Sequence, residues 1–227
     1  MNRLTAVLIV AFSLFFSAGA TAGSDTQLIT TNEISFTHPV RASRNAAVKI
    51  ISADGGHGSG IYVIYKKHRA VLTADHVVDS GSIYRVTANG NEVFGVVVWR
   101  AADADLALLA IEDGLQQEPI KLAHVTNLEA GTRISYSGFP SSYELLSVNG
   151  TISGFDSRGY ILMQGFGWFG ASGAGVINQA NKIVGVVTAL PVESFHGHPQ
   201  VLESLILVTP LQLQHINQIG AVLSVLK

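Results

Sequence analysis

Short apolar runs fill the chain from about residue 45 onward, with Gly, Asn, Asp and Ser between them. Runs of four to eight residues that are rich in Val, Ile and Leu and bounded by turn residues predict β-strands. We expect six strands in each half of this region. The expected strands span residues 47–52, 61–65, 70–73, 83–87, 93–99 and 106–111, and then 134–138, 145–152, 161–164, 175–177, 183–189 and 205–208.

The two series of strands have a similar rhythm, and residues 112–132 between them are expected to form a linker. Two closed sheets explain this pattern better than one open sheet, because closure removes exposed strand edges. The sequence therefore predicts an all-β fold with two six-stranded antiparallel β-barrels, at residues 45–125 and 126–209. Residues 210–227 are expected to form a short helix and tail across the back of the second barrel, with Pro210 in the first helical turn.

The first residues have the pattern of a cleavable signal peptide, which we place at residues 1–22. An apolar run from Leu4 to Phe16 follows Arg3, and small residues stand at Ala20 and Ala22. A retained membrane anchor is the alternative, but the run is shorter than the roughly 20 residues that span a bilayer. We expect an exported protein, secreted or periplasmic. Residues 23–44 form a lead-in, which could be a propeptide, an oligomerisation arm or a disordered segment.

Composition limits the chemistry and the partners. With 14 Lys and Arg against 16 Asp and Glu, the formal net charge is −2, which does not favour nucleic acid or an anionic membrane as a partner. Without cysteine, the chain has neither a disulfide nor a thiol nucleophile, and no thiolate can bind a metal. We expect protein or peptide substrates and no cofactor. The oligomeric state stays open.

Three segments carry residues suited to amide hydrolysis by a serine, which needs a base, a group that orients the base, and donors for the oxyanion. His76 follows an apolar run in the segment LTADHVV, and Asp105 opens the run DLALL. Ser172 lies in the glycine-rich segment GASG at residues 170–173. We predict Ser172 as nucleophile, His76 as general base and Asp105 as the orienting acid, while Asp103 is expected to be a solvated turn residue.

These segments, together with GSG at residues 58–60, resemble the trypsin-like serine peptidases, most closely the bacterial HtrA/Deg-type branch without a PDZ domain. The resemblance covers most of the chain after the lead-in. It implies a serine-type endopeptidase with two β-barrels and a His76, Asp105, Ser172 triad. Two features depart from the pattern. Asp75 stands where a small or amide residue is usual, and Ala174 with Gly175 follows the nucleophile.

The resemblance also assigns the oxyanion donors, which are the backbone N–H groups of Gly170 and Ser172. In animal zymogens of this fold, a newly cut N-terminus pairs with an acid just before the nucleophile, but here that residue is Ala171. That switch cannot operate, so other contacts must order the loop. Trp168 and Phe169 are candidates for those contacts, or else core residues.

Family pocket geometry predicts which residues bind the side chain before the cleaved bond. Phe166 would form the floor of the pocket, and Thr188, Ala189 and Leu190 its wall. An apolar floor cannot neutralise a buried Lys or Arg side chain. Leu190 would shorten the pocket. We therefore expect cleavage after small or medium apolar residues.

Three other functions compete with this prediction. An α/β-hydrolase would need an acid after the serine, and no Asp follows Ser172. A metal hydrolase could use His196 and His198, although no metal-binding motif surrounds them, and we expect both in a surface loop. A catalytically silent member of the trypsin-like fold could instead serve as a peptide- or protein-binding module.

Overall fold

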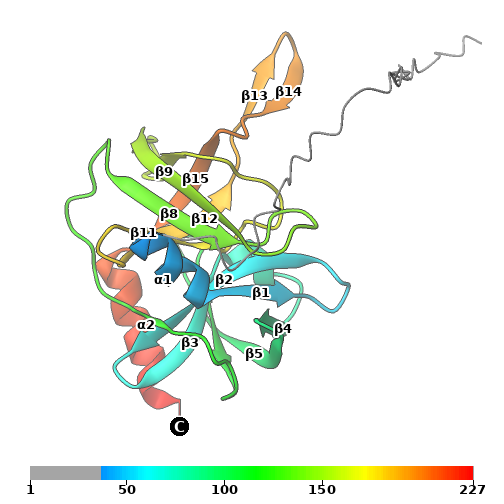
Figure 1. Ribbon diagram of the computed structural model, residues 1–227, viewed down its shortest axis with the longest axis vertical. Coiled ribbons are helices and arrows are strands. Elements are labelled where there is room, and N and C mark those ends of the chain that lie inside the picture. Colours follow the sequence, from blue (N-terminus) through cyan, green and yellow to red (C-terminus); the bar gives the residue numbers. More distant parts are fainter. Residues whose placement is uncertain (1–36, 227) are drawn as a thin grey trace, which may run out of the picture. The chain divides into compact units, whose positions relative to one another are not determined.

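Two closed rings of strands make up most of the computed structural model, which describes residues 37–226 (Figure 1). The expected signal peptide at residues 1–22 and the first part of the lead-in lie outside the described residues. Every strand that the sequence predicts is present, with ends shifted by a few residues. The expected fold, two six-stranded antiparallel barrels with a C-terminal helix, is confirmed.

In the first ring, the alternation of buried and exposed residues along each strand places one face in the barrel core. Along β4, for example, Tyr84 and Val86 are buried while Ile83 and Arg85 face outward. The ring closes because β1 pairs with both β4 and β2, and a short β7 adds to β2 in parallel. The strands are β1 (Ala47–Ile51), β2 (His57–Tyr65), β3 (His68–Thr73), β4 (Ile83–Ala88), β5 (Asn91–Arg100), β6 (Ala107–Ile111) and β7 (Ile120–Lys121).

The second ring is built the same way and has a separate core, which includes Tyr136, Met163 and Val208. The strands pair in the order β10, β15, β12, β11, β8 and β9, and the ring is closed. They span β8 (Arg133–Gly138), β9 (Leu146–Phe155), β10 (Ile161–Gln164), β11 (Gly175–Asn178), β12 (Ile183–Ala189) and β15 (Leu205–Pro210).

A helix that the sequence analysis did not predict, α1 (His38–Ala46), precedes the first barrel. Pro39 stands in its first turn, where a missing N–H costs nothing, and the buried residues Val40, Ser43 and Ala46 follow at intervals of three. The helix packs mainly on β8, β9 and β11. Arg44 Nη1 also donates to Leu145 O at 3.1 Å. The described part of the lead-in is therefore a helix bound to the second barrel.

The C-terminal helix, α2 (Leu213–Val225), does not pack where the sequence analysis placed it. Its buried residues Ile216, Ile219 and Leu223 join the core of the first barrel, not the second. Gly220 allows the close approach, because a Cβ there would lie 2.7 Å from Tyr65 Cε1. Pro210 was also misplaced, since it is the last residue of β15.

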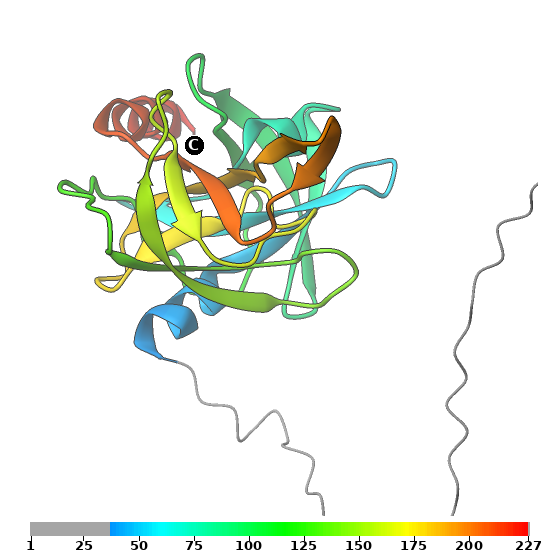
Figure 2. The same cartoon turned by 90° about the horizontal axis from the view of Figure 1, so that it is seen from above.

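A two-stranded hairpin, β13 (Val192–Phe195) and β14 (His198–Val201), replaces the surface loop expected after β12. Its residues are exposed, and the hairpin projects away from the barrels in Figure 1, while Figure 2 looks down on it from above. His196 and Gly197 form the turn with φ angles of 50° and 81°, as a two-residue hairpin turn requires. Between residues 37 and 226, no helix has the length and apolar character needed to cross a membrane.

Candidate active site

His76 lies in a single turn of 3-10 helix, η2 (Asp75–Val78), that follows β3 of the first barrel. Arg100 at the end of β5 holds this turn from outside, since its guanidinium donates to the Asp75 carboxylate and to Val78 O. Asp75, which departs from the family pattern, is thus the partner of Arg100. Its carboxylate supports the turn that carries His76.

Asp105 contacts His76 through both of its carboxylate oxygens. His76 Nδ1 lies 2.8 Å from Asp105 Oδ2, and the His76 backbone N–H donates to Asp105 Oδ1 at 3.0 Å. A carboxylate on Nδ1 favours the tautomer that carries its proton there, which leaves Nε2 as the acceptor. The arrangement therefore fixes both the ring and the nitrogen that can accept a proton.

The same contact shifts both pKa values. The hydrogen bond that His76 donates to Asp105 is the main cause that raises the pKa of His76 above its usual value, and partial burial opposes it. Burial on its own would raise the pKa of Asp105, but the hydrogen bonds from the His76 side chain and backbone outweigh it and lower that pKa. His76 is consequently a stronger base than a free histidine, and Asp105 stays ionised at neutral pH.

Asp103 lies away from His76, although it stands only two residues before Asp105. It accepts from Gln214 Nε2 at 2.7 Å and lies 3.3 Å from His215 Nε2. Both partners belong to the first turn of α2. Asp103 therefore does more than the solvated turn residue that we expected, because it fastens the C-terminal helix to the loop that carries Asp105.

Ser172 lies in a tight loop between β10 and β11 of the second barrel, and two glycines shape that loop. Gly170 has φ +92° and Gly173 has φ +89°, values that L side chains rarely adopt. Space is lacking as well, because a Cβ on Gly173 would lie 1.9 Å from Ser59 O. These two positions explain why the segment around the serine is rich in glycine.

Within the segment from Gly170 to Gly173, two of the four backbone N–H groups have partners among the described residues. Ala171 N–H donates to Trp168 O at 3.0 Å, and Gly173 N–H donates to Val187 O at 2.8 Å. The N–H groups of Gly170 and Ser172 donate to no atom of the described residues. Unpaired backbone donors are uncommon in folded proteins, so these two groups are available to an incoming acceptor.

The Ser172 hydroxyl donates to Thr188 O at 3.4 Å, and the described residues contain no hydrogen bond between Ser172 and His76. This contact is long for an O–H···O hydrogen bond, which usually measures 2.5 to 3.0 Å. Catalytic hydrogen bonds are often loose without substrate. The two side chains nevertheless line one cavity, so the structure brings all three predicted residues to one region.

That cavity has a volume of about 320 Å³ and is mostly apolar. Three of the four predicted substrate-binding residues, Thr188, Ala189 and Leu190, line it. Apart from His76, no titratable side chain does so. The full lining consists of His76, Gly167, Trp168, Phe169, Ala171, Ser172, Val187, Thr188, Ala189, Leu190, Val192 and Val201.

The structure does not place Phe166 among the residues that line this cavity, and the residue is 42% exposed. The next residue, Gly167, does line the cavity. Hydrogen bonds hold the backbone at these two residues, since Tyr136 Oη donates to Phe166 O at 2.7 Å and Gly167 N–H donates to Glu203 O at 3.0 Å. Phe166 therefore does not form the floor.

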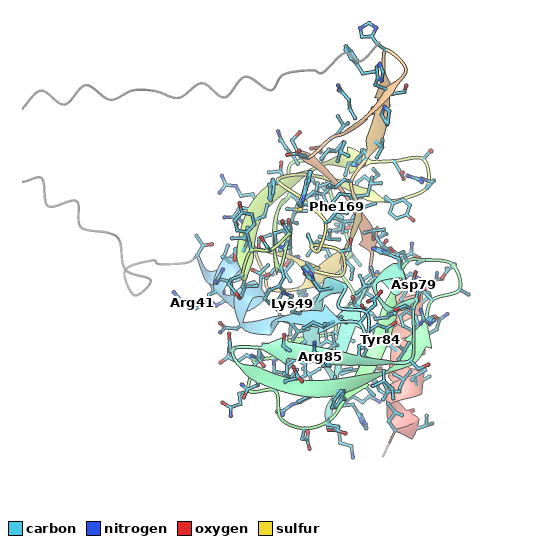
Figure 3. The ribbon with its side chains drawn as sticks, turned by 90° about the vertical axis from the view of Figure 1, so that its right-hand side faces the viewer. Arg41, Lys49, Asp79, Tyr84, Arg85 and Phe169 are labelled. Atoms are coloured by element: carbon cyan, nitrogen blue, oxygen red, sulfur yellow. The ribbon has the colours of Figure 1, made fainter. Side chains whose placement is uncertain are left out.

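A second cavity, also about 320 Å³, shares His76 and Ser172 with the first. Asp79 lines it from the first barrel and Phe169 from the second (Figure 3). The two cavities therefore meet at Ser172 and His76.

Residues 58–186 match the family model of the trypsin-like peptidase domain. The chain belongs to this family. The match covers more than half of the sequence and includes His76, Asp105 and Ser172. The expected family and enzyme class, a serine-type peptidase, are thereby confirmed.

Solved structures of serine proteases share the fold of this peptidase domain. The Rv3671c protease of M. tuberculosis, in an inactive form, is 19% identical with a TM-score of 0.63, covering 82% of this chain and 92% of its own. The serine endoprotease from Yersinia pestis is 20% identical with a TM-score of 0.65, covering 85% of this chain and 69% of its own. No curated protein matches the sequence.

Two residues that line the first cavity of the peptidase site were not predicted from the sequence. Val192 and Val201 line the first cavity from the base of the hairpin, where they face each other across the two strands. The Phe195 to His198 segment, with Gly197 between polar residues, could have indicated the hairpin.

Among residues 37–226, no three His, Cys, Asp or Glu side chains form a group that could hold a metal ion.

Proposed function

We propose that the protein is an exported serine endopeptidase in which Ser172, His76 and Asp105 act as a triad. One observation carries the proposal. The two unpaired N–H groups of the nucleophile loop belong to Gly170 and Ser172, and the loop lines a cavity with a histidine that is already oriented by an acid. This arrangement supplies the base, the orienting acid and the oxyanion donors that acyl transfer needs.

In the proposed reaction, His76 Nε2 takes the Ser172 proton as Oγ attacks the substrate carbonyl. The carbonyl oxygen becomes negatively charged, and the N–H groups of Gly170 and Ser172 stabilise it. Asp105 stabilises the imidazolium that forms. His76 then gives the proton to the leaving amine, and water hydrolyses the acyl-enzyme with His76 again as the base.

The first cavity supports a preference for small or medium apolar residues before the cleaved bond. Its walls include Val187, Ala189 and Leu190, and it contains no carboxylate that could pair with Lys or Arg. Burying such a cation without a partner costs several kcal/mol. Leu190 is the residue that limits depth in this proposal, and it packs closely on Gly167, where an added Cβ would lie 2.7 Å from Leu190 Cδ2.

Export is proposed from the N-terminal sequence alone. Arg3, an apolar run and small residues at Ala20 and Ala22 form a signal-peptide pattern. N-terminal sequencing of the protein recovered outside the cytoplasm tests this. We expect mature protein that begins near Gly23, and full-length protein starting at Met1 would contradict export with cleavage.

The test of the proposed function is a cleavage profile on an unfolded protein mixture, read by mass spectrometry. Wild-type protein should cut mainly after Ala, Val, Ile or Leu, and Ser172→Ala should lose about 10⁴-fold to 10⁶-fold in kcat while remaining folded. A chelator should change nothing. Ordinary turnover by Ser172→Ala would refute the triad, and a majority of cuts after Lys or Arg would refute the pocket assignment.

The competing function, a catalytically silent binding module, is favoured by one contact. The Ser172 hydroxyl donates to Thr188 O and not to His76. If this contact persists in the presence of substrate, the protein would bind peptides without cleaving them. Peptide binding by wild-type protein together with a complete absence of cleavage would support that function over the peptidase.

A further inference from the structure

The direction of each unpaired N–H in the nucleophile loop is set by the carbonyl of the same peptide unit. A trans peptide is planar, so its N–H points opposite to its C=O. The unit of Gly170 N–H contains Phe169 O, which accepts from Ser141 N–H at 2.6 Å. The unit of Ser172 N–H contains Ala171 O, which accepts from Ala174 N–H at 3.0 Å. The N–H groups of Gly170 and Ser172 therefore point away from Ser141 and Ala174, which bind the carbonyls of the same peptide units.

Two further carbonyls of this loop, those of Gly170 and Ser172, are bound by a single residue of the other barrel. Ser59 Oγ donates to Gly170 O at 2.7 Å, and Ser59 N–H donates to Ser172 O at 2.7 Å. Ser59 belongs to β2 and is fully buried. Each of the two unpaired N–H groups is thus followed in the chain by a peptide unit whose carbonyl is bound by Ser59 of the first barrel.

The Ser59 hydroxyl is itself fixed by its neighbours. Phe139 N–H donates to Ser59 Oγ at 2.9 Å, which leaves the hydroxyl proton directed at Gly170 O. Thr73 Oγ1 donates to Ser59 O at 2.7 Å and holds the backbone. Phe139 O in turn lies 3.0 Å from His57 Nε2. His57 lies at the start of β2, so this contact also joins the first barrel to the second.

From these contacts we propose that Ser59 is a positioning residue for the oxyanion donors of Gly170 and Ser172. The inference rests on the proposed function. Position 171 is an alanine and not an acid, so no ion pair can order this loop from there. Instead, neutral hydrogen bonds from Ser59 in β2 hold the carbonyls of Gly170 and Ser172 directly. Phe169, which is 71% exposed, and Trp168 do not supply these bonds. The loop is therefore in its working conformation without a cleavage that creates a charged partner.

The test removes the hydroxyl in Ser59→Ala and compares it with Ser135→Ala. Ser135 is a matched control, because it is also a buried serine in a strand but its Oγ has no hydrogen-bond partner. In Ser59→Ala we expect kcat to fall about tenfold to a hundredfold, less than the roughly 10²-fold to 10³-fold loss when an oxyanion donor is removed. KM should stay within about twofold, since the donors act mainly in the transition state. Ser135→Ala should retain wild-type kcat.

Hydrogen exchange of the peptide that covers residues 168–174 gives a readout that does not depend on activity. Exchange should be faster in Ser59→Ala than in Ser135→Ala, because the loop loses one of its anchors. Thr73→Val, which removes only the bond to Ser59 O, should raise the exchange rate of this peptide by a smaller amount. This variant replaces Ser59→Ala in the test if Ser59→Ala does not fold. Unchanged kcat, a loss confined to KM, or an equal loss in Ser135→Ala would overturn the inference.

Failure of this inference can be distinguished from failure of the proposed function. Wild-type protein without turnover would refute the peptidase, yet faster loop exchange in Ser59→Ala would still support Ser59 as the anchor of the loop. An active wild-type enzyme with unchanged kcat and exchange in Ser59→Ala would refute only the inference.

Discussion

The two barrels hold their parts of the site by different means. In the first barrel, side chains hold side chains, since Asp105 orients His76 and Arg100 binds Asp75. The His76 side chain is 45% exposed. In the second barrel, the loop around Ser172 is held through its backbone groups, which bind other backbone groups and the Ser59 hydroxyl. Changes in the first barrel should therefore alter the strength of the base, whereas changes in the second should alter the geometry of the oxyanion donors.

Among changes to the residues that hold the site, the largest effect is expected from Asp105→Asn in the first barrel. An amide favours the wrong histidine tautomer, so kcat should fall by about 10⁴-fold. The hydrogen bond that raises the pKa of His76 is weakened while burial still lowers it. The rise of kcat/KM with pH lies above about pH 6.5 in the wild type and should move to lower pH in the variant. A variant with an unshifted pH profile would contradict the assigned role of Asp105.

The matching change in the second barrel is Gly170→Ala. Its Cβ would lie 2.5 Å from Phe139 O, at a φ of +92°. We expect a loss of about 10²-fold to 10³-fold in kcat because the donor is displaced. Gly159→Ala is the control, since φ is +89° and the surrounding space is empty. It should cost only the backbone strain of about 1 to 2 kcal/mol, measured by thermal unfolding, with kcat unchanged. Equal kcat values for the two variants would contradict the assignment of Gly170.

A smaller effect should follow Arg100→Met. Loss of the guanidinium frees Asp75 and Val78 O, so the turn that carries His76 loosens. Measured kcat should fall severalfold. Arg85→Met removes an exposed pair with Glu92 at 3.3 Å, and such pairs contribute little. Its kcat should match the wild type, and a comparable loss in both variants would show that Arg100 has no special role.

The smallest effects on rate, with clear effects on selectivity, are expected at the pocket. Leu190→Gly should shift cleavage toward Phe and Tyr, because it deepens a pocket that discriminates by about 1 to 3 kcal/mol per methylene. Phe166→Ala should leave the cleavage profile unchanged, since that side chain is exposed outside the cavity. A shift in the profile of Phe166→Ala would restore Phe166 to the pocket.

The sequence predicts local structure well and long-range placement poorly. Strands were predictable because alternation and turn residues are local signals, and the residues around His76 and Ser172 form short motifs. The packing of α2 on the first barrel was not predictable, since the apolar face at Ile216 and Ile219 fits either barrel. Phe166 was placed at the pocket floor by resemblance, and it is absent from the cavity lining because the course of the loop after β10 depends on contacts with distant residues such as Tyr136 and Glu203.

The role of Ser59 was equally hidden from sequence analysis. A serine between two glycines in a strand resembles a turn residue, and its partners at Phe139 and Gly170 lie 80 and 111 residues away. Arg100 likewise lies 25 residues from Asp75. Contacts of this kind depend on the closure of both barrels, which no local pattern encodes.

The most direct test of the account is labelling by a fluorophosphonate probe, with the modified residue located by peptide mass spectrometry. Only a serine that is activated by a neighbouring base should react. Wild-type protein is predicted to carry one adduct, on Ser172, and His76→Ala should carry none. An unlabelled wild-type protein, or an adduct on another serine, would contradict the assignment of Ser172 as the nucleophile.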